Sequence, residues 1–164
     1  MIFADTNILV YALDDREPVK QEIAQRVLRE AEQSRLVIST QVLQELYVAM
    51  GRSRISAATA AAAVRAWAAG EVVVVTVEMV VEATVLHQQH KLHFWDAVIL
   101  QAAISSGCTT LYTEDMQHGR EIGGVRIVNP FANEVHEAAV AYAPTPVKRA
   151  RRPRTAAGRP ARKG

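Results

Sequence analysis

Short runs of apolar and β-branched residues alternate along the chain with longer segments of helical periodicity. The short runs lack a regular alternation of apolar and polar positions, which is typical of strands buried on both faces. They predict strands over 2–4, 36–39, 72–76, 109–113 and 125–128. The longer segments predict helices over 17–33, 41–50, 56–69, 78–92 and 95–106. This order favours one α/β domain, in which helices flank a central, mostly parallel sheet of about five short strands.

Local sequence features place several helix ends. Gly51, Gly70 and Gly107 stand where glycine commonly follows the last turn of a helix. Ser56 precedes an alanine-rich segment and suits the N-cap position, because its hydroxyl can accept a backbone N–H bond. We therefore expect helix boundaries at these four residues.

The composition is that of a globular chain. The 164 residues are 49% hydrophobic and 22% charged, and no apolar run approaches the roughly 20 residues that a bilayer-spanning helix needs. No basic segment followed by an apolar one opens the sequence, so no secretory signal is expected. The single cysteine, Cys108, excludes an internal disulfide and fits a reducing compartment. We expect a soluble protein of the cytoplasm that has no membrane partner and whose mature chain begins at residue 1.

The charge is distributed unevenly along the chain. Of the 19 Lys and Arg residues, eight lie in the last seventeen positions, so the other 11 face 17 acids and give the rest of the chain a net charge of −6. No large apolar residue follows Val147, and such a segment cannot contribute to a core. We therefore divide the chain into a folded domain over 1–133, an extension over 134–142, and a basic, disordered tail over 143–164.

Four carboxylates stand in unusual surroundings: Asp5, Glu45, Asp96 and Asp115. No Lys or Arg lies within three residues of any of them, although an ionised carboxylate in an apolar setting is unfavourable without a partner. Asp5 and Asp115 follow predicted strands, and open parallel sheets bind ligands beyond the carboxyl ends of their strands. Clustered carboxylates suit Mg²⁺ or Mn²⁺ better than zinc. The missing partner is therefore predicted to be a metal ion, with Thr6 and Asn7 able to orient a water or an acid.

Each of these acids also has an ordinary structural explanation. Asp5 could cap a helix over 6–13, and Asp96 could simply favour the positive end of a helix dipole. Glu45 could reach water from the edge of an apolar stripe, and Asp115 could form a turn. Four such positions together favour a shared site more than any one of them does.

Other residues that could carry chemistry are assigned structural roles. His87, His90 and His93 recur at every third position, and two of them could share a helix face that binds zinc. No cysteine lies near them and no acid adjoins the set, so we expect a solvated helix end. Trp67 and Trp95 are expected to pack in the interior, because aromatic residues are too scarce, at 5%, to indicate recognition of single strands by stacking. The thiol of Cys108 is expected to be buried and inert.

Several motifs of this chain occur in a specific order over about residues 1–133. They are Asp5-Thr6-Asn7, a mid-helix Glu45, Asp96-Ala97 at the start of an apolar helix, Thr113-Glu114-Asp115, and Val128-Asn129-Pro130-Phe131. In this order and spacing the chain resembles the PIN-domain nucleases, and more narrowly the VapC-type ribonuclease toxins of bacterial toxin–antitoxin pairs.

The resemblance implies a function and a set of site residues. Asp5 and Asp96 would be the principal ligands of Mg²⁺ or Mn²⁺, Glu45 and Asp115 would complete the acidic pocket, and Thr113 would support it by hydrogen bonding. The implied activity is Mg²⁺-dependent endoribonucleolytic hydrolysis of RNA by the toxin of a type II toxin–antitoxin system. The resemblance also implies a homodimer, and a cognate antitoxin whose tail can block the groove.

Two other functions remain open from the sequence. A phosphatase could use Asp5 as its nucleophile, but such an enzyme would need a second acid two residues later, where this chain has Asn7. A non-catalytic protein could instead bind a basic peptide in its acidic groove and RNA through its tail. The tail cations, such as Arg149, Arg151 and Arg152, could raise RNA affinity through phosphate contacts, belong to an unselected extension, or fold back onto the acidic groove.

Overall fold

The computed structural model describes residues 1–32, 34–52 and 55–132. The predicted extension over 134–142 and the basic tail over 143–164, with Arg149, Arg151 and Arg152, lie outside the described residues. The helices are α1 (Thr6–Leu13), α2 (Pro18–Glu32), α3 (Thr40–Arg52), α4 (Ala57–Ala68), α5 (Val77–His90) and α6 (Phe94–Ser105). The strands are β1 (Ile2–Ala4), β2 (Leu36–Ser39), β3 (Glu71–Val73), β4 (Thr110–Tyr112), β5 (Glu121–Ile122) and β6 (Val125–Val128).

The strands form one sheet in the order β3-β2-β1-β4-β6-β5. All neighbouring strands are parallel except β5 and β6, and Phe3 of β1 is in register with Val37 on one side and Leu111 on the other. The predicted α/β fold with a mostly parallel sheet is therefore confirmed.

The sheet has six strands, whereas the sequence predicted about five, because β5 was not predicted. This edge strand has only two residues, which is too short to show any periodicity. It pairs with β6 across Gly123 and Gly124, which have φ values of +58° and +78°. A two-residue hairpin turn with positive φ at both positions favours glycine, so the Gly-Gly pair was the available sequence signal.

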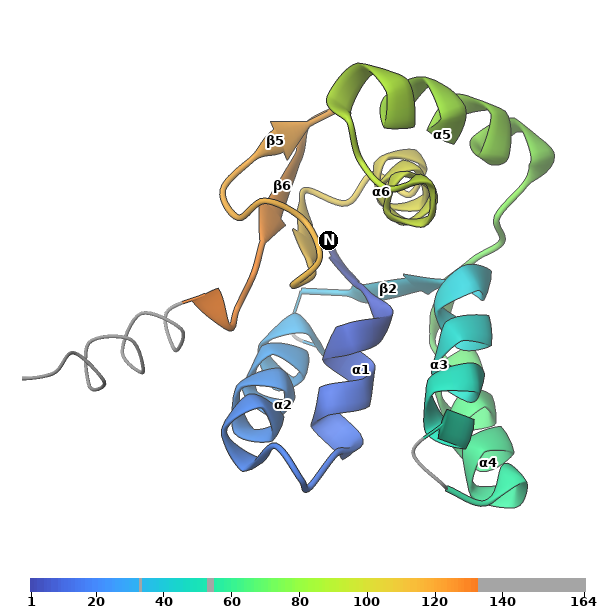
Figure 1. Cartoon of the computed structure of the whole chain (residues 1–164), viewed down its shortest axis with the longest axis vertical. Helices are drawn as coiled ribbons and strands as arrows, with labels where there is room; N and C mark the ends of the chain where they lie inside the picture. The colour runs from blue at the N-terminus through green and yellow to red at the C-terminus, as the bar shows by residue number, and fades with distance from the viewer. Residues whose placement is uncertain (33, 53–54, 133–164) are drawn as a thin grey trace, which may run out of the picture.

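Helices cover the sheet on both sides (Figure 1), with α5 and α6 on one side and α1 to α4 on the other. Every residue of α6 from Ala97 to Ala103 is buried. A helix that is apolar on all sides must be enclosed, and α6 packs against both the sheet and α5. This arrangement fixes the first turn of α6, which carries Asp96.

The predicted helix ends are mostly confirmed. Ser56 caps α4, and Gly107 follows the end of α6 with a φ of +71°. Gly70 follows the last turn of α4, whereas the expected end at Gly51 was wrong because α3 continues through it. Helix α5 ends at His90, and its C-cap residue Lys91 adopts the left-handed conformation without being glycine. The other predicted boundaries lie within three residues of the observed ones.

Two expectations about composition can be compared with the described residues. None of the helices in the part of the chain that the structure describes is both long and apolar enough to cross a bilayer. Cys108 is buried, and burial raises the pKa of its thiol, so the expectation of an inert cysteine is supported.

Candidate functional site

The order of the strands reverses at β1. The chain proceeds from β1 to β2 and β3 on one side, and β4 and β6 lie on the other. In open α/β sheets, ligands bind outside the carboxyl ends of the strands at such a reversal. Asp5 follows β1, Thr113 follows β4, and α3 begins at Thr40, directly after β2. The topology therefore brings three of the predicted motifs to one edge.

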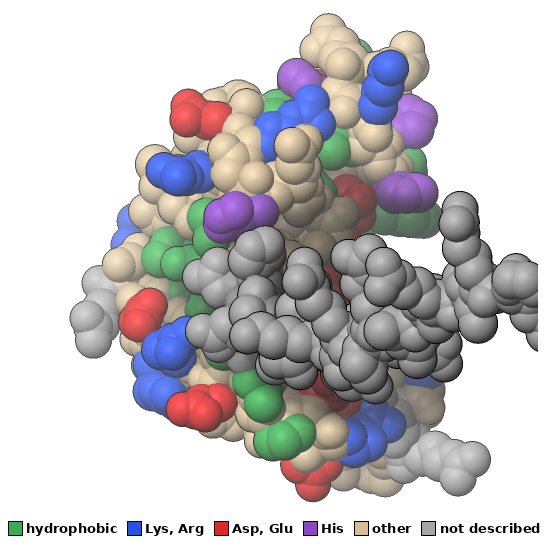
Figure 2. All heavy atoms as spheres, turned by 60° about the vertical axis from the view of Figure 1, so that its left-hand side comes forward, with side chains coloured by type: hydrophobic (Ala, Val, Ile, Leu, Met, Phe, Trp, Pro, Cys, Tyr) green, Lys and Arg blue, Asp and Glu red, His purple; other side chains and the backbone are tan. Residues whose placement is uncertain are grey.

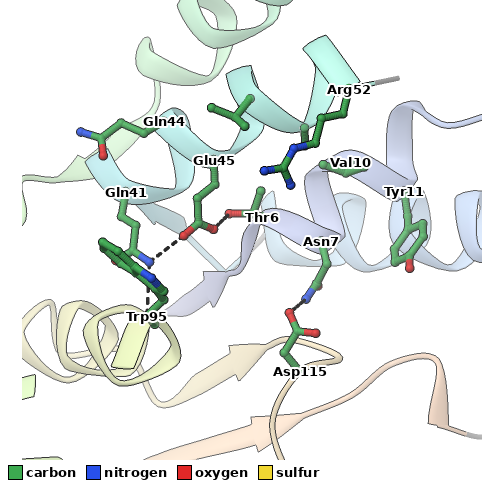
Figure 3. Close-up of a pocket in the computed structure, with 12 residues that line it drawn as sticks. Thr6, Asn7, Val10, Tyr11, Gln41, Gln44, Glu45, Arg52, Trp95 and Asp115 are labelled. Atoms are coloured by element: carbon green, nitrogen blue, oxygen red, sulfur yellow. Dashed lines mark hydrogen bonds between the residues drawn. The ribbon is translucent and has the colours of Figure 1, made fainter. Parts of the chain in front are cut away.

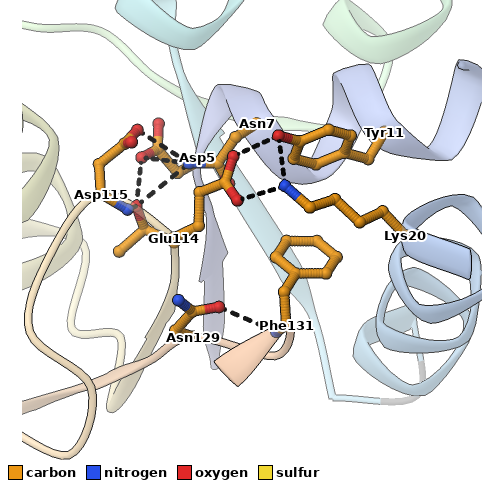
Figure 4. Close-up of polar contacts among 9 residues, drawn as sticks. Asp5, Asn7, Tyr11, Lys20, Glu114, Asp115, Asn129 and Phe131 are labelled. Atoms are coloured by element: carbon orange, nitrogen blue, oxygen red, sulfur yellow. Dashed lines mark hydrogen bonds and ion pairs between the residues drawn. The ribbon is translucent and has the colours of Figure 1, made fainter. Parts of the chain in front are cut away.

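Asp5 is almost fully buried at this edge, with 5% of its surface exposed. Its Oδ1 accepts a hydrogen bond from the Thr6 backbone N–H (2.6 Å), and its Oδ2 accepts one from the Thr113 hydroxyl (2.7 Å; Figure 4). Burial raises the pKa of Asp5 to about 7 although these hydrogen bonds lower it, and the charges of Glu45 and Asp115 raise it further. Asp5 also caps α1, so its structural explanation and its place in the acidic site both hold.

Asn7 and Thr113 connect Asp5 to Asp115. The Asn7 Nδ2 lies 3.0 Å from Asp115 Oδ2, 3.3 Å from Thr113 Oγ1 and 3.4 Å from Asp5 Oδ2. Thr113 Oγ1 also accepts a hydrogen bond from the Asp115 backbone N–H (3.1 Å). The supporting residues expected from the sequence are thus in contact with the acids.

Glu45 approaches the same site from α3 (Figure 3). Its Oε2 accepts a hydrogen bond from the Thr6 hydroxyl (2.7 Å), and its Oε1 accepts one from Gln41 Nε2 (2.8 Å). The Thr6 bond holds the carboxylate toward α1 and the Gln41 bond fixes it on the face of α3, so Glu45 does not merely reach into water. Sequence analysis missed Gln41, although its position four residues before Glu45 places both on one helix face.

Asp96 lies half-buried in the first turn of α6. Burial raises the pKa of its carboxyl, the charge of Asp115 raises it further, His93 lowers it, and Glu45 raises it again. Asp96 is therefore close enough to Asp115 and Glu45 to interact with their charges. The favourable helix dipole applies as well, but it does not account for this approach of like charges.

The donor set fits a divalent ion bound partly through water. No salt bridge of the described residues involves any of the four acids, and the charges of Glu45 and Asp115 raise the pKa of both Asp5 and Asp96. The buried oxygens Asn7 Oδ1 and Gln41 Oε1 have no donor among the described residues. Within those residues no three His, Cys, Asp or Glu side chains form a ready-made metal cage. Mg²⁺ is commonly held by one or two carboxylates and several waters, which matches such an open arrangement.

A second polar cluster adjoins the acids, and sequence analysis did not find it. Lys20 Nζ lies 2.9 Å from Glu114 Oε2 and donates to the Tyr11 hydroxyl (2.8 Å), which donates to Glu114 Oε1 (2.5 Å; Figure 4). Phe131 packs edge-on against Tyr11, with ring centroids 5.1 Å apart. The Glu114 charge is thereby balanced by Lys20, and its neighbour Asp115 remains directed toward Asn7.

Replacing Lys20 with Met should destabilise the protein by about 1–2 kcal/mol, because the partly buried Glu114 and Tyr11 lose a charged partner. The change is measured as the free energy of unfolding in urea. The matched control is Glu71→Gln, which removes the exposed pair with Arg35 and should change stability by less than about 0.5 kcal/mol. Equal effects of the two substitutions would contradict a supporting role for the Lys20 cluster.

The histidines form the solvated helix end that the sequence predicted. His87 Nδ1 lies 2.6 Å from the Leu92 carbonyl oxygen, and His90 Nδ1 lies 3.1 Å from Arg120. In the space-filling view of Figure 2, histidine side chains (purple) lie near Lys and Arg side chains (blue) in the upper half of the surface shown. In the described ranges no group of three potential ligands could hold zinc.

The two tryptophans differ in their surroundings. Trp67 is partly buried against the main core, as expected. Trp95 is 65% exposed, so the expectation that it packs in the interior was wrong. It lies in the first turn of α6, before the buried stretch of that helix begins at Ala97. Exposure of this kind cannot be inferred from residue type alone.

Fold and site together define a class of protein: an α/β domain with a carboxylate-lined pocket at the switch point of a parallel sheet, suited to a hard divalent ion. The PIN domain model matches residues 2–120, and the chain belongs to the PIN-domain family. No curated protein matches the chain by sequence.

Solved structures with the same fold support this assignment. The fold is similar to a toxin–antitoxin complex from Klebsiella pneumoniae (TM-score 0.59, 22% identity), over 79% of this chain and 98% of that one. It is also similar to VapBC2 from Rickettsia felis, solved bound to a DNA fragment from the VapBC2 promoter (TM-score 0.58, 20% identity), over 79% of this chain and 98% of that one. A third similar structure is VapC20 of Mycobacterium tuberculosis, a sarcin–ricin loop cleaving toxin. It matches with a TM-score of 0.54 and 26% identity, over 68% of this chain and 87% of that one. The resemblance to VapC-type PIN domains is thus confirmed.

Proposed function

We propose that this protein is a metal-dependent endoribonuclease and the toxin of a bacterial type II toxin–antitoxin pair. The observation that carries the proposal is the convergence of Asp5, Glu45, Asp96 and Asp115 at the switch point of the sheet, where none of them forms a salt bridge among the described residues. A carboxylate cluster that repels itself suits a bound cation.

In this proposal Asp5 and Asp96 hold Mg²⁺ or Mn²⁺, and Glu45 and Asp115 complete the pocket. A divalent ion would neutralise charge that develops on a phosphodiester and make water more acidic. Glu45 and Asp115 line the open cavity and are the groups able to accept a proton from the attacking water.

Three polar side chains support the site in this proposal. The hydroxyl of Thr6 keeps Glu45 turned toward α1. Asn7 and Thr113 fix the spacing between Asp5 and Asp115.

The proposed biological partners are supported by the likeness to solved proteins. Likeness to proteins solved as toxin–antitoxin complexes supports a cognate antitoxin, and likeness to a toxin that cleaves the sarcin–ricin loop supports RNA as substrate. A homodimer working in the cytoplasm completes the proposal.

The decisive experiment incubates the purified chain with a labelled single-stranded RNA in Mg²⁺, in EDTA, and in EDTA followed by excess Mg²⁺. We expect cleavage only when the metal is present, with 5′-phosphate and 3′-hydroxyl ends because water is the nucleophile. An RNA carrying a single 2′-deoxy nucleotide at the cut should still be cleaved. RNA binding without product, surviving replacement of all four acids, would instead support the non-catalytic protein with an acidic groove.

A further inference from the structure

A cavity of about 660 Å³ opens beside the acids. Its lining includes Glu45 and Asp115 and extends along α1 and α3 to the start of α6. Trp95 lines this cavity and is 65% exposed, although indole is among the largest apolar side chains. The neighbouring Phe94 packs edge-on against it, with ring centroids 5.6 Å apart. An exposed aromatic face therefore stands next to Asp96.

Gln41 fixes the position of Trp95 relative to the acids. Its Nε2 donates to the Trp95 carbonyl oxygen (3.2 Å) as well as to Glu45 Oε1 (2.8 Å; Figure 3). Gln41 itself is 6% exposed, and its amide is shared between the two partners. The backbone at Trp95 is thus bound to the same buried side chain that orients a predicted catalytic carboxylate.

Arg52 lies on the other side of Glu45 from Trp95 (Figure 3). It is the cation in the cavity lining, and among the described residues it forms no salt bridge. Val10, Val48 and Ala49 add apolar surface to the lining. The cavity therefore presents an aromatic face, carboxylates and a guanidinium in succession.

We propose that Trp95 stacks on an unpaired base next to the phosphate to be cut, and that Arg52 contacts a phosphate of the same RNA strand farther along the cavity. This inference rests on the proposed function. Single-stranded RNA is recognised by stacking of splayed bases on aromatic side chains and by cationic contacts to its backbone. Glu45 lies between the two contacts (Figure 3), so a strand that meets both would pass over this carboxylate. That placement favours RNA over a second copy of this chain as the occupant.

The test for Trp95 combines a protein variant with modified RNA. Trp95→Ala should raise KM and weaken RNA binding in EDTA by roughly tenfold, with little change in kcat, while Trp95→Phe should retain most of the affinity. An abasic nucleotide is then placed at each position of the substrate in turn. At one position it should weaken RNA binding by the wild type about tenfold and should not further weaken binding by Trp95→Ala. Tyr47→Ala, which removes an exposed aromatic outside the cavity lining, is the matched control and should leave both values unchanged.

The test for Arg52 uses salt. Arg52→Gln should weaken RNA binding and lower the slope of log affinity against log salt by about one, because one phosphate contact is lost. The Trp95 variants should leave this slope unchanged, since stacking releases no counterion. Arg65→Gln removes an exposed cation of α4 outside the cavity lining and should leave the slope as it is in the wild type.

Binding and cleavage separate the possible failures. If the wild type cuts RNA but Trp95→Ala binds and cuts it normally, the inference is overturned and the nuclease proposal stands. If Trp95→Ala loses the self-association that the wild type shows in sedimentation but still binds RNA normally, the stacking inference is overturned in favour of a second copy of this chain as the occupant. If the wild type never cuts RNA but Trp95→Ala weakens its binding, the nuclease proposal fails and the stacking contact stands.

Discussion

The Asp5→Asn variant is expected to lose RNA cleavage by roughly a thousandfold or more and, in metal-free buffer, to be more stable than the wild type at pH 8. The loss of cleavage follows because a neutral amide binds Mg²⁺ poorly, and the ion supplies several kcal/mol of charge stabilisation. Asparagine caps helices as well as aspartate does, so the cap of α1 should survive.

The gain in stability follows from the pKa of Asp5. This value rises from 3.8 to about 7 on folding, chiefly through burial. Between those two pH values the folded chain keeps a proton that the unfolded chain has lost, so the metal-free wild type loses stability as the pH rises. The total loss is on the order of 4 kcal/mol by pH 8, and Asp5→Asn should not show it.

Thermal unfolding in EDTA at pH 5 and pH 8 measures this difference. The wild type should melt at a lower temperature at pH 8 than at pH 5, and the difference should shrink in Asp5→Asn. Excess Mg²⁺ should raise the melting temperature of the wild type at pH 8 and have much less effect on the variant. A metal-free wild type that is equally stable at both pH values would contradict the raised pKa.

The Asp96→Asn variant is expected to lose cleavage to a similar degree with almost no change in stability. Asp96 is half-buried, and its charge is repelled by Asp115 and Glu45. Its removal relieves that repulsion and also forfeits about 0.3–1 kcal/mol of interaction with the dipole of α6, so the two effects nearly cancel. Cleavage rates and urea unfolding of the same preparation provide both measurements.

Glu78→Gln is the matched control for Asp96→Asn. Glu78 is also an acid in the first turn of a helix, but that helix is α5, and the charges of the clustered acids do not affect its pKa as they do that of Asp96. The control should change stability little and keep full activity. If Asp96→Asn cleaved RNA as well as Glu78→Gln does, Asp96 would have only a dipole role.

The sequence predicts much of this fold because local features and topology agree. Short apolar strands that alternate with helices leave few arrangements other than a mostly parallel sheet. Asp5 and Asp115 could be assigned to one edge because the carboxyl ends of parallel strands lie together. That β4 neighbours β1, which brings Thr113 within 2.7 Å of Asp5, becomes evident only from the structure.

Other features depend on contacts that no local pattern encodes. Lys20 and Glu114 are 94 residues apart, and neither stands in an unusual sequence environment. Trp95 follows Phe94 and precedes an apolar helical segment, as a core residue could, yet its place in the first turn of α6 leaves it 65% exposed. The roles of the four acids as metal ligands stay predictions until a metal is seen to bind them.

The absence of any connecting residue between β2 and α3 limits how this protein can vary. Because Thr40 starts the helix directly after Ser39, Glu45 stands a fixed number of residues from the sheet. One residue inserted at that junction would rotate the carboxylate by about 100° around the helix axis and advance it by about 1.5 Å. Length changes should therefore be tolerated in surface turns, whereas the interval from Ser39 to Glu45 should be invariant in length among active homologues.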